Sequence, residues 1–105
     1  MITISLCMIV KNEERILARC LDSVKDLVDE IVIVDTGSAD ATKRIAAEYT
    51  DKIYDFTWID DFSAARNFAF SKASKEYIYS ADADEVLSEE NRQRFRLLKI
   101  GRAHV

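Results

Sequence analysis

Glycine is scarce in this chain of 105 residues, which contains only two. Gly37 is the single glycine in the body of the chain, and Gly101 lies near its end. A Gly-x-Gly-x-x-Gly turn and a Walker loop each need several glycines so that the backbone can approach phosphate, so neither motif can exist here. Dinucleotide-binding and P-loop proteins are therefore excluded. Any phosphate would have to be held by a metal ion and by cationic side chains.

Long apolar runs are also missing. None approaches the ~18 residues needed to span a bilayer, and the N-terminus lacks the basic region and apolar stretch of a secretion signal. We therefore expect a cytoplasmic location. Cys7 falls in a predicted strand and Cys20 in a predicted helix. We therefore interpret both as small, buried apolar side chains rather than as a disulfide or a pair of metal ligands. The net charge of −4 argues against general nucleic-acid binding, which needs a basic face.

Histidine occurs once, as His104, within a tail that continues none of the preceding pattern. The tail, IGRAHV at residues 100–105, matches one reading frame of a widely used sequencing adapter. We expect it to be non-native, which leaves residues 1–99 as the N-terminal part of one domain whose natural chain is longer. The alternative is a frayed helix end with Gly101 as its stop. If the tail is non-native, histidine-based catalysis is excluded for this segment.

The body of the chain alternates between the period of a strand and the period of a helix. Strands are predicted at residues 2–10, 30–34, 52–56 and 76–81. Helices are predicted after each strand: one capped by Asn12 with a buried stripe over 16–28, one capped by Ser38 or Asp40, one at 62–73 and one from Ser88. The order βαβαβαβ predicts an α/β fold of the Rossmann-like kind, with a mostly parallel four-stranded sheet and helices on both faces.

Polar side chains follow three of the predicted strands. They are Asn12 after the first strand, residues 35–38 after the second and residues 82–85 after the fourth. Right-handed crossovers bring the carboxyl ends of parallel strands to one edge. Open α/β sheets bind ligands at that edge. The sequence therefore predicts one shared site.

Two aspartates in that predicted site flank a single residue. Asp82 and Asp84 in extended chain point the same way, and a pair of carboxylates suits Mg²⁺-like ions, which leave other positions to water and substrate phosphates. The alternative is that they serve solubility or helix capping. Asp35 can accept hydrogen bonds from a base or a ribose, or it can cap a turn.

Four segments resemble family 2 glycosyltransferases of the GT-A fold, and the resemblance covers almost the whole body. The segments are VDTGSADAT at 34–42, DADE at 82–85, MIVKNEE at 8–14 and WIDDFSAARN at 58–67. The last two are similar to a narrower branch, which contains lipooligosaccharide core β-1,4-glucosyltransferases and tetratricopeptide-linked glycosyltransferases. The chain is thereby predicted to be the nucleotide-diphospho-sugar-binding half of a GT-A domain.

The resemblance implies a role for individual residues. Val10, Lys11 and Asn12 would border the nucleotide, and Asp35 would hold the uracil. Arg66 would lie near the base or the diphosphate, because its guanidinium presents a planar fork of hydrogen-bond donors. Without the resemblance, Arg66 would be interpreted as a solvated arginine on a helix. Asp82 would contact the ribose or the metal, and Asp84 would ligate Mn²⁺ or Mg²⁺. Trp58 and Phe62 are predicted to be core or loop anchors rather than sugar platforms.

The function implied is sugar transfer from a nucleoside diphosphate, by analogy UDP-glucose with inversion, to an acceptor hydroxyl. The acceptor would be a glycan such as a lipopolysaccharide core, a lipid-linked molecule or a peptide. The family takes its general base from the later half of the domain, so no catalytic residue is expected in this chain. Residues beyond the chain would supply the acceptor site and any peripheral membrane association.

Two rival functions remain open at this point. A nucleotidyltransferase also uses acidic strand ends and a divalent metal, but the chain has no Gly-rich, Lys-bearing first loop. A non-catalytic interaction module of flavodoxin-like shape would make Asp35 and Asp82 chance loop acids. Neither rival explains the segment at 58–67. Metal-dependent binding of a nucleoside diphosphate separates the module from the enzymes, and competition between UDP and UTP separates the two enzymes.

Overall fold

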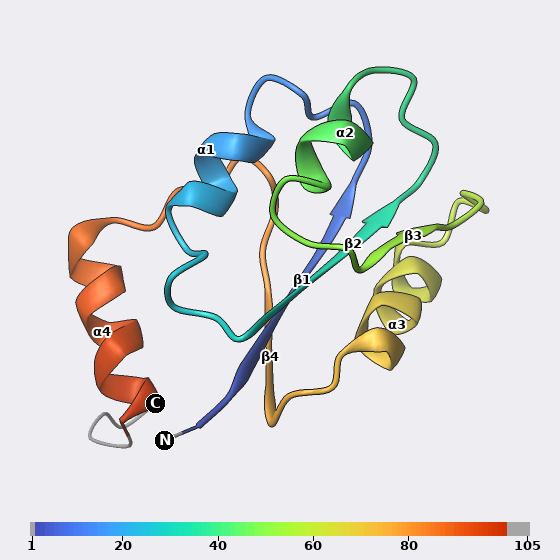
Figure 1. Ribbon diagram of the computed structural model, residues 1–105. Coiled ribbons are helices and arrows are strands. Elements are labelled where there is room, and N and C mark those ends of the chain that lie inside the picture. The colour runs from blue at the N-terminus through green and yellow to red at the C-terminus, as the bar shows by residue number, and fades with distance from the viewer. Residues whose placement is uncertain (1, 101–105) are drawn as a thin grey trace.

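The structure is a computed structural model that describes residues 2–100, in which strands and helices alternate along the chain (Figure 1). The predicted tail at 100–105 lies outside the described residues except for Ile100, whose N–H donates to the carbonyl of Arg96 at 3.2 Å. The elements are β1 (Ile4–Val10), α1 (Leu17–Asp22), β2 (Glu30–Asp35), α2 (Thr42–Ala46), β3 (Ile53–Asp55), α3 (Phe62–Lys72), β4 (Tyr77–Ser80) and α4 (Glu89–Lys99).

The four strands form one parallel sheet in the order β3-β2-β1-β4. This confirms the predicted α/β fold. The register places Val10 beside Asp35 and Asp35 beside Asp55. The carboxyl ends of the first three strands are therefore level, and the loops that follow them start from one line.

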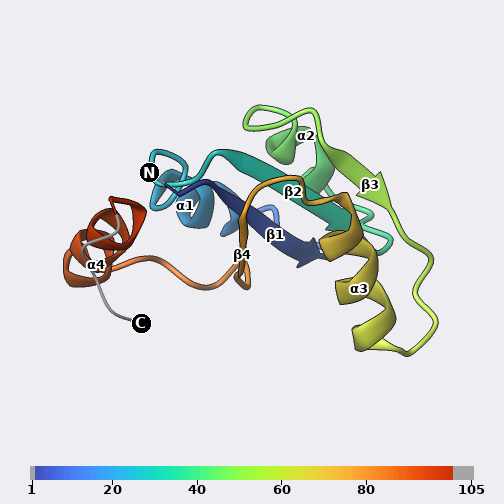
Figure 2. The same cartoon turned by 90° about the horizontal axis from the view of Figure 1, so that it is seen from below.

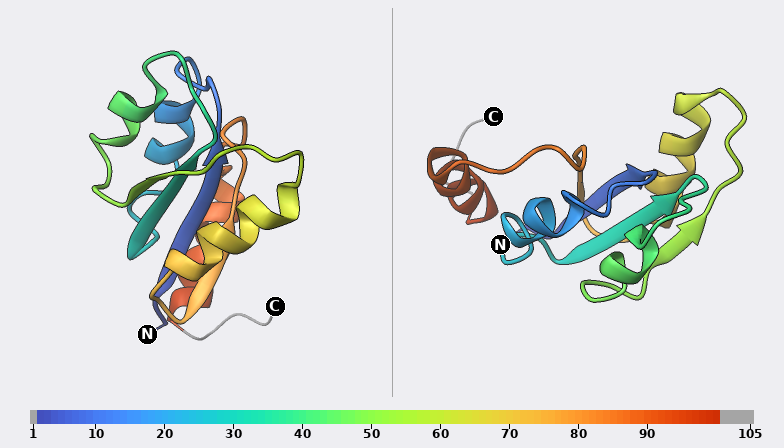
Figure 3. Two further views of the ribbon diagram at one scale, coloured as in Figure 1. Left: turned by 90° about the vertical axis from the view of Figure 1, so that its right-hand side faces the viewer. Right: turned by 90° about the horizontal axis from the view of Figure 1, so that it is seen from above.

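Helices cover both faces of the sheet, as the alternation predicts (Figure 3). Side chains of even number on β1 pack with α1 and α2 in one core, which includes Leu6, Met8 and Leu21. The opposite face packs against α3 in a second core, which includes Cys7 and Val32. Because successive strand residues point to opposite faces, a strand covered on both sides is apolar throughout, which explains the unbroken run of β2.

The first helix begins later than predicted. The chain leaves β1 through Asn12, whose φ of 53° is left-handed, and passes through a turn in which Ile16 and Leu17 donate to the carbonyl of Glu13. Helix α1 then starts at Leu17, so the predicted cap at Asn12 is wrong. The physical reason is that the Asn12 side chain bonds to the loop after β2 instead.

Helix α4 lies beside α1 at one end of the molecule (Figure 2). Ser88 caps it as predicted, because its Oγ accepts a hydrogen bond from the N–H of Asn91 at 3.1 Å. Arg92 holds the helix in place with two hydrogen bonds to Asp26, at 2.9 and 2.6 Å, and one to the carbonyl of Ser23 at 2.7 Å. Between residues 2 and 100 no helix is long and apolar enough to cross a membrane.

Both cysteines are free and buried, which confirms that they are not a disulfide pair. Burial raises the pKa of each thiol to about 11, with nearby carboxylates adding to the effect. Thiols with so high a pKa are neutral near pH 7 and are poor nucleophiles. Cys7 and Cys20 therefore contribute packing rather than chemistry.

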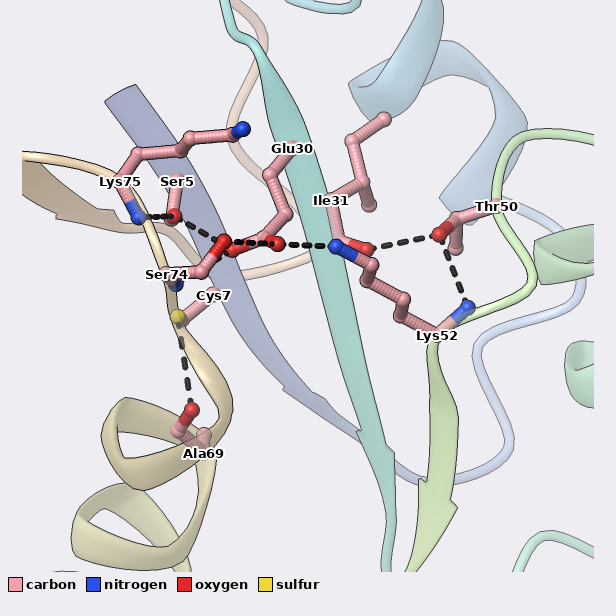
Figure 4. A network of polar contacts seen from close by, with 9 residues as sticks. All are labelled: Ser5, Cys7, Glu30, Ile31, Thr50, Lys52, Ala69, Ser74 and Lys75. Atoms are coloured by element: carbon pink, nitrogen blue, oxygen red, sulfur yellow. Dashed lines mark hydrogen bonds and ion pairs between the residues drawn. The ribbon is translucent and has the colours of Figure 1, made fainter. Parts of the chain in front are cut away.

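A buried carboxylate ties the amino ends of the strands together (Figure 4). Glu30, at the start of β2, is 6% exposed. It accepts hydrogen bonds from the Ser5 hydroxyl at 2.6 Å and from the N–H and hydroxyl of Ser74 at 2.8 and 2.7 Å. Lys52 forms an ion pair with it. This network joins β1, β2, the residue preceding β3 and the segment after α3, at the edge opposite the predicted site.

Candidate functional site

The loops after β1 and β2 interlock at the carboxyl edge of the sheet. The backbone N–H of Asn12 donates to the Ser38 hydroxyl at 2.9 Å. The side-chain oxygen of Asn12 accepts a hydrogen bond from the N–H of Ala39 at 2.8 Å. The N–H of Glu13 donates to the hydroxyl of Thr42 at 2.8 Å. Asparagine tolerates the left-handed backbone better than most residues. Asn12 is therefore a brace between the two loops.

Asp35, the last residue of β2, holds the turn that follows it. Its Oδ1 accepts hydrogen bonds from the N–H groups of Gly37 and Ser38, both at 2.8 Å. Gly37 has a φ of 110°, a backbone conformation that favours glycine. The other oxygen, Oδ2, is buried and is the one such side-chain atom without a hydrogen-bond partner among the described residues. Leaving a buried acceptor unpaired is unfavourable, so this oxygen is suited to receive a donor from a ligand.

Asp82 and Asp84 lie on a tight turn directly after β4. The N–H of Asp82 donates to a carboxylate oxygen of Glu85 at 2.9 Å, and the N–H of Glu85 donates to the Asp82 carbonyl at 3.0 Å. Ala83 between them is buried, whereas both aspartates are exposed. The two aspartates line one hollow of about 400 Å³, together with Ile9, Glu13, Ile16 and Ala83. Both side chains therefore line the same hollow, but the segment is a turn and not the extended chain on which the sequence argument depended.

A second hollow, of about 280 Å³, lies at the same edge. It is lined by Ile9, Val10, Lys11, Glu13, Thr36, Trp58 and Phe62. Trp58 and Phe62 are 42% and 51% exposed, so of the two predicted roles, core anchor or loop anchor, the role of core anchor is wrong. Trp58 lies within the loop between β3 and α3, and Phe62 is the first residue of α3, and neither is covered by the two cores.

The two hollows are contiguous, because Ile9 and Glu13 line both. Of the predicted site residues, the structure brings Val10 and Lys11 to one hollow and Asp82 and Asp84 to the other. Asp35 lines neither hollow but is next to two residues that line the first, Val10 in the sheet and Thr36 in the chain. Arg66 lines neither. It is exposed on α3, with its guanidinium carbon 5.4 Å from the centroid of the Phe62 ring.

Sequence reasoning missed the position of Glu13. The predicted helix cap at Asn12 would place Glu13 in the first turn of a helix, whereas that segment is a non-helical loop and Glu13 lines both hollows. The position of Glu13 depends on the left-handed backbone of Asn12. The sequence does not show which φ an asparagine adopts, so this position could not be predicted.

The aspartate pair fits a hard divalent cation that the substrate helps to hold. In the described part of the chain neither carboxylate is paired with another side chain, so both remain available. No three His, Cys, Asp or Glu side chains between residues 2 and 100 are grouped so that they could hold a metal ion unaided. Mg²⁺ and similar ions bind through one or two carboxylates and take their remaining ligands from water and phosphate. Two exposed carboxylates beside a hollow meet that requirement.

The family model described as glycosyl transferase family 2 matches residues 5–95. The chain belongs to this family. A TPR repeat-containing protein of Synechococcus elongatus is 53% identical over 87 residues, which are 83% of this chain and 22% of that protein. The SPbeta prophage-derived glycosyltransferase SunS of Bacillus subtilis is 39% identical over 102 residues, 95% of this chain and 24% of that protein. The family 2 chain thus spans about a quarter of the length of these relatives.

Solved structures show the same fold. Glucosyl-3-phosphoglycerate synthase of Mycobacterium tuberculosis, in complex with Mn²⁺ and UDP-glucose, aligns with a TM-score of 0.72 and 21% identity over 95% of this chain and 40% of that one. S. aureus TarS aligns with a TM-score of 0.72 and 24% identity over 87% of this chain and 30% of that one. The described residues of this family 2 chain therefore have the GT-A fold.

Proposed function

We propose that this chain is the donor-binding part of a glycosyltransferase that transfers a sugar from a nucleoside diphosphate, of the UDP-glucose kind, to an acceptor hydroxyl. The observation that carries the proposal is the pair of contiguous hollows at the carboxyl edge. One has an aromatic wall and lies near Asp35, whose buried oxygen is unpaired, and the other has two carboxylates that bond to no other side chain of the described residues. A nucleoside diphosphate needs a flat apolar slot for its base and a metal-binding group for its diphosphate, and the two hollows offer these in adjoining places.

Asp84 and Asp82 would hold Mn²⁺ or Mg²⁺ in the second hollow, and Asp82 could instead contact the ribose. A divalent cation supplies positive charge that neutralises the diphosphate leaving group. The hydrogen bonds between Asp82 and Glu85 hold the backbone of the turn that carries the two carboxylates. The synthase from M. tuberculosis, whose structures include Mn²⁺ and Mg²⁺ complexes with UDP or UDP-glucose, supports this assignment by analogy.

Base recognition would fall to Asp35 and the residues around the first hollow. The uracil N3–H is a donor, and the Asp35 Oδ2 is an acceptor shielded from water, so a bond between them would be charge-assisted. Reaching Oδ2 requires a small displacement of the residues that cover it. Val10, Lys11 and Asn12 would border the nucleotide. Arg66 would reach the base or the diphosphate only by leaving the Phe62 ring.

The acceptor proposed is a glycan such as a lipopolysaccharide core, a lipid-linked molecule or a peptide. Deprotonating its hydroxyl requires a general base, and we assign none to residues 2–100. We therefore propose that this chain alone binds the donor but has little or no transferase activity. Matched titrations of UDP and UTP test the class of enzyme, because a donor site binds UDP at least as tightly as UTP, whereas a nucleotidyltransferase site prefers the triphosphate.

Replacing Asp35 with asparagine tests the proposed base contact. Asparagine keeps one oxygen for the N–H groups of Gly37 and Ser38 and presents its amide N–H₂ where Oδ2 was. A donor then faces a donor, and the loss of one charge-assisted hydrogen bond, about 1.5–3 kcal/mol, corresponds to a fall in UDP affinity of roughly 10- to 150-fold. Calorimetric titration measures this fall, and circular dichroism checks the fold.

Asp55→Asn is the matched control, since Asp55 lies beside Asp35 in the sheet and is exposed. Its affinity for UDP should equal that of the unmodified chain. An Asp35→Asn chain that is folded and binds UDP as tightly as the control would contradict the role given to Asp35.

A further inference from the structure

The exposure of two aromatic side chains at the first hollow is not explained by packing. Trp58 and Phe62 are 42% and 51% exposed, although large aromatic side chains are usually well buried. They share one lining with Val10, Lys11 and Thr36. Exposed apolar side chains gathered in a concave site are typical of ligand binding.

The Trp58 ring is held in place before any ligand binds. Its indole N–H donates to a carboxylate oxygen of Asp60 at 2.9 Å. Asp60 itself has a φ of 57°, an uncommon left-handed conformation that disfavours residues with a side chain. The left-handed backbone of Asp60 is therefore locally strained, and it places the Asp60 carboxylate where it bonds to the indole of Trp58. A ring that is already ordered loses little conformational entropy when a ligand binds against it.

Phe62 is positioned by the start of α3. Asp61 caps this helix through a hydrogen bond from the N–H of Ala64 to its side chain at 3.1 Å, so Phe62 is the first helical residue. The guanidinium of Arg66, one turn later, lies over the Phe62 ring at 5.4 Å. Two aromatic residues from one short segment thus line the hollow, and each is oriented by an aspartate or an arginine of the same segment.

We propose that Trp58, with Phe62 beside it, is the stacking wall for the nucleobase of the donor and so a residue that determines the affinity for the nucleotide. This inference rests on the proposed donor site. The base is favoured over the sugar because Thr36 and Val10, which are neighbours of Asp35 in the chain and in the sheet, line this hollow. The aspartate pair that would hold the diphosphate lines the other hollow. Stacking on an aromatic ring serves any base, and hydrogen bonding by Asp35 would select uracil.

Trp58 is the only tryptophan of the chain, so its fluorescence reports on this hollow alone. UDP in the presence of Mg²⁺, and uridine alone at higher concentration, should both change the emission in a saturable way. Pyrophosphate and glucose 1-phosphate should not. Trp58→Ala should weaken UDP binding about tenfold or more, as loss of one base-aromatic stack does, while Trp58→Phe should retain most of the affinity.

Ile59→Ala is the matched control, because Ile59 is the next residue, is 60% exposed and is not part of the hollow's lining. If UDP binds by calorimetry but Trp58→Ala and Ile59→Ala bind it equally and the emission is unchanged, the stacking role is overturned and the donor site stands. If glucose 1-phosphate changes the emission and uridine does not, Trp58 contacts the sugar and the inference is wrong. If calorimetry detects no binding of any nucleotide, both the proposed donor site and the stacking role of Trp58 are contradicted.

Discussion

Replacing Asp84 with alanine should abolish metal-dependent binding of UDP and leave the fold intact. Only Asp82 would remain to hold the cation, and a single exposed carboxylate binds Mg²⁺ or Mn²⁺ too weakly to bridge it to a diphosphate. Asp84 is exposed and unpaired in the described part of the chain, so its loss should change the free energy of unfolding by about 0.5 kcal/mol or less. Titration calorimetry with and without Mn²⁺ measures the binding, and urea unfolding measures the stability.

Asp51→Ala provides the comparison, because Asp51 is an exposed aspartate that lines neither hollow of the carboxyl edge. It should bind UDP with the same metal dependence as the unmodified chain. The assignment of the metal site fails if the Asp84→Ala chain shows an unchanged affinity for UDP in Mn²⁺ and still loses that affinity when the metal is removed.

The second large effect is expected at Glu30, which stabilises the fold rather than the site. Burial alone would raise the pKa of this carboxyl, but hydrogen bonds from Lys52, Ser5 and Ser74 outweigh burial and lower the pKa from 4.5 to about 2. A carboxyl whose pKa is lower in the folded state contributes stability that is fully present above its unfolded pKa. This contribution is lost as the pH falls from about 4.5 towards 2, and it amounts to roughly 3 kcal/mol.

Glu30→Gln should therefore lower the free energy of unfolding at pH 7 by roughly 2–3 kcal/mol. It should also flatten the further loss that the unmodified chain shows between pH 4.5 and pH 2. The amide keeps the size of the side chain and can still accept hydrogen bonds from serine, but it cannot form an ion pair with Lys52. Urea unfolding at a series of pH values measures both effects.

Glu48→Gln removes an exposed glutamate near the same edge and should leave both quantities within about 0.5 kcal/mol of the unmodified chain. UDP affinity of the Glu30→Gln chain should not change under conditions where it is folded, because the network lies at the edge opposite the two hollows. Equal stability of Glu30→Gln and Glu48→Gln at pH 7 would show that the network adds nothing to the fold.

The arrangement of the sheet was predictable because periodicity carries it. Alternating strand and helix patterns predicted a parallel sheet covered on both faces, and the two-residue spacing of Asp82 and Asp84 predicted that they share one side. The sheet follows from where successive side chains point, which local sequence determines. Asp82 and Asp84 line one hollow although they lie on a turn, so alternation along an extended chain does not explain their position. The family motifs then pointed to the same edge as the site.

Backbone exceptions and long-range contacts were not predictable in the same way. Asn12 and Asp60 adopt left-handed conformations that no periodicity signals. The start of α1 was therefore misplaced, and the exposure of Trp58 was not predicted. An aromatic residue is expected to be buried because its side chain is large and apolar. Only the fold shows whether another layer covers that side chain. The network of Glu30 joins residues 22 to 44 positions away along the chain, and no local pattern encodes it.

The most direct test of the donor site is a calorimetric titration of UDP into the folded 105-residue chain, with and without Mn²⁺, after circular dichroism has verified the fold. The proposed site predicts saturable binding in Mn²⁺ and a large loss of affinity when the metal is chelated. A well-folded chain that binds no UDP in Mn²⁺, or binds it equally with and without the metal, would contradict the proposal that Asp82 and Asp84 hold a cation for a nucleoside diphosphate.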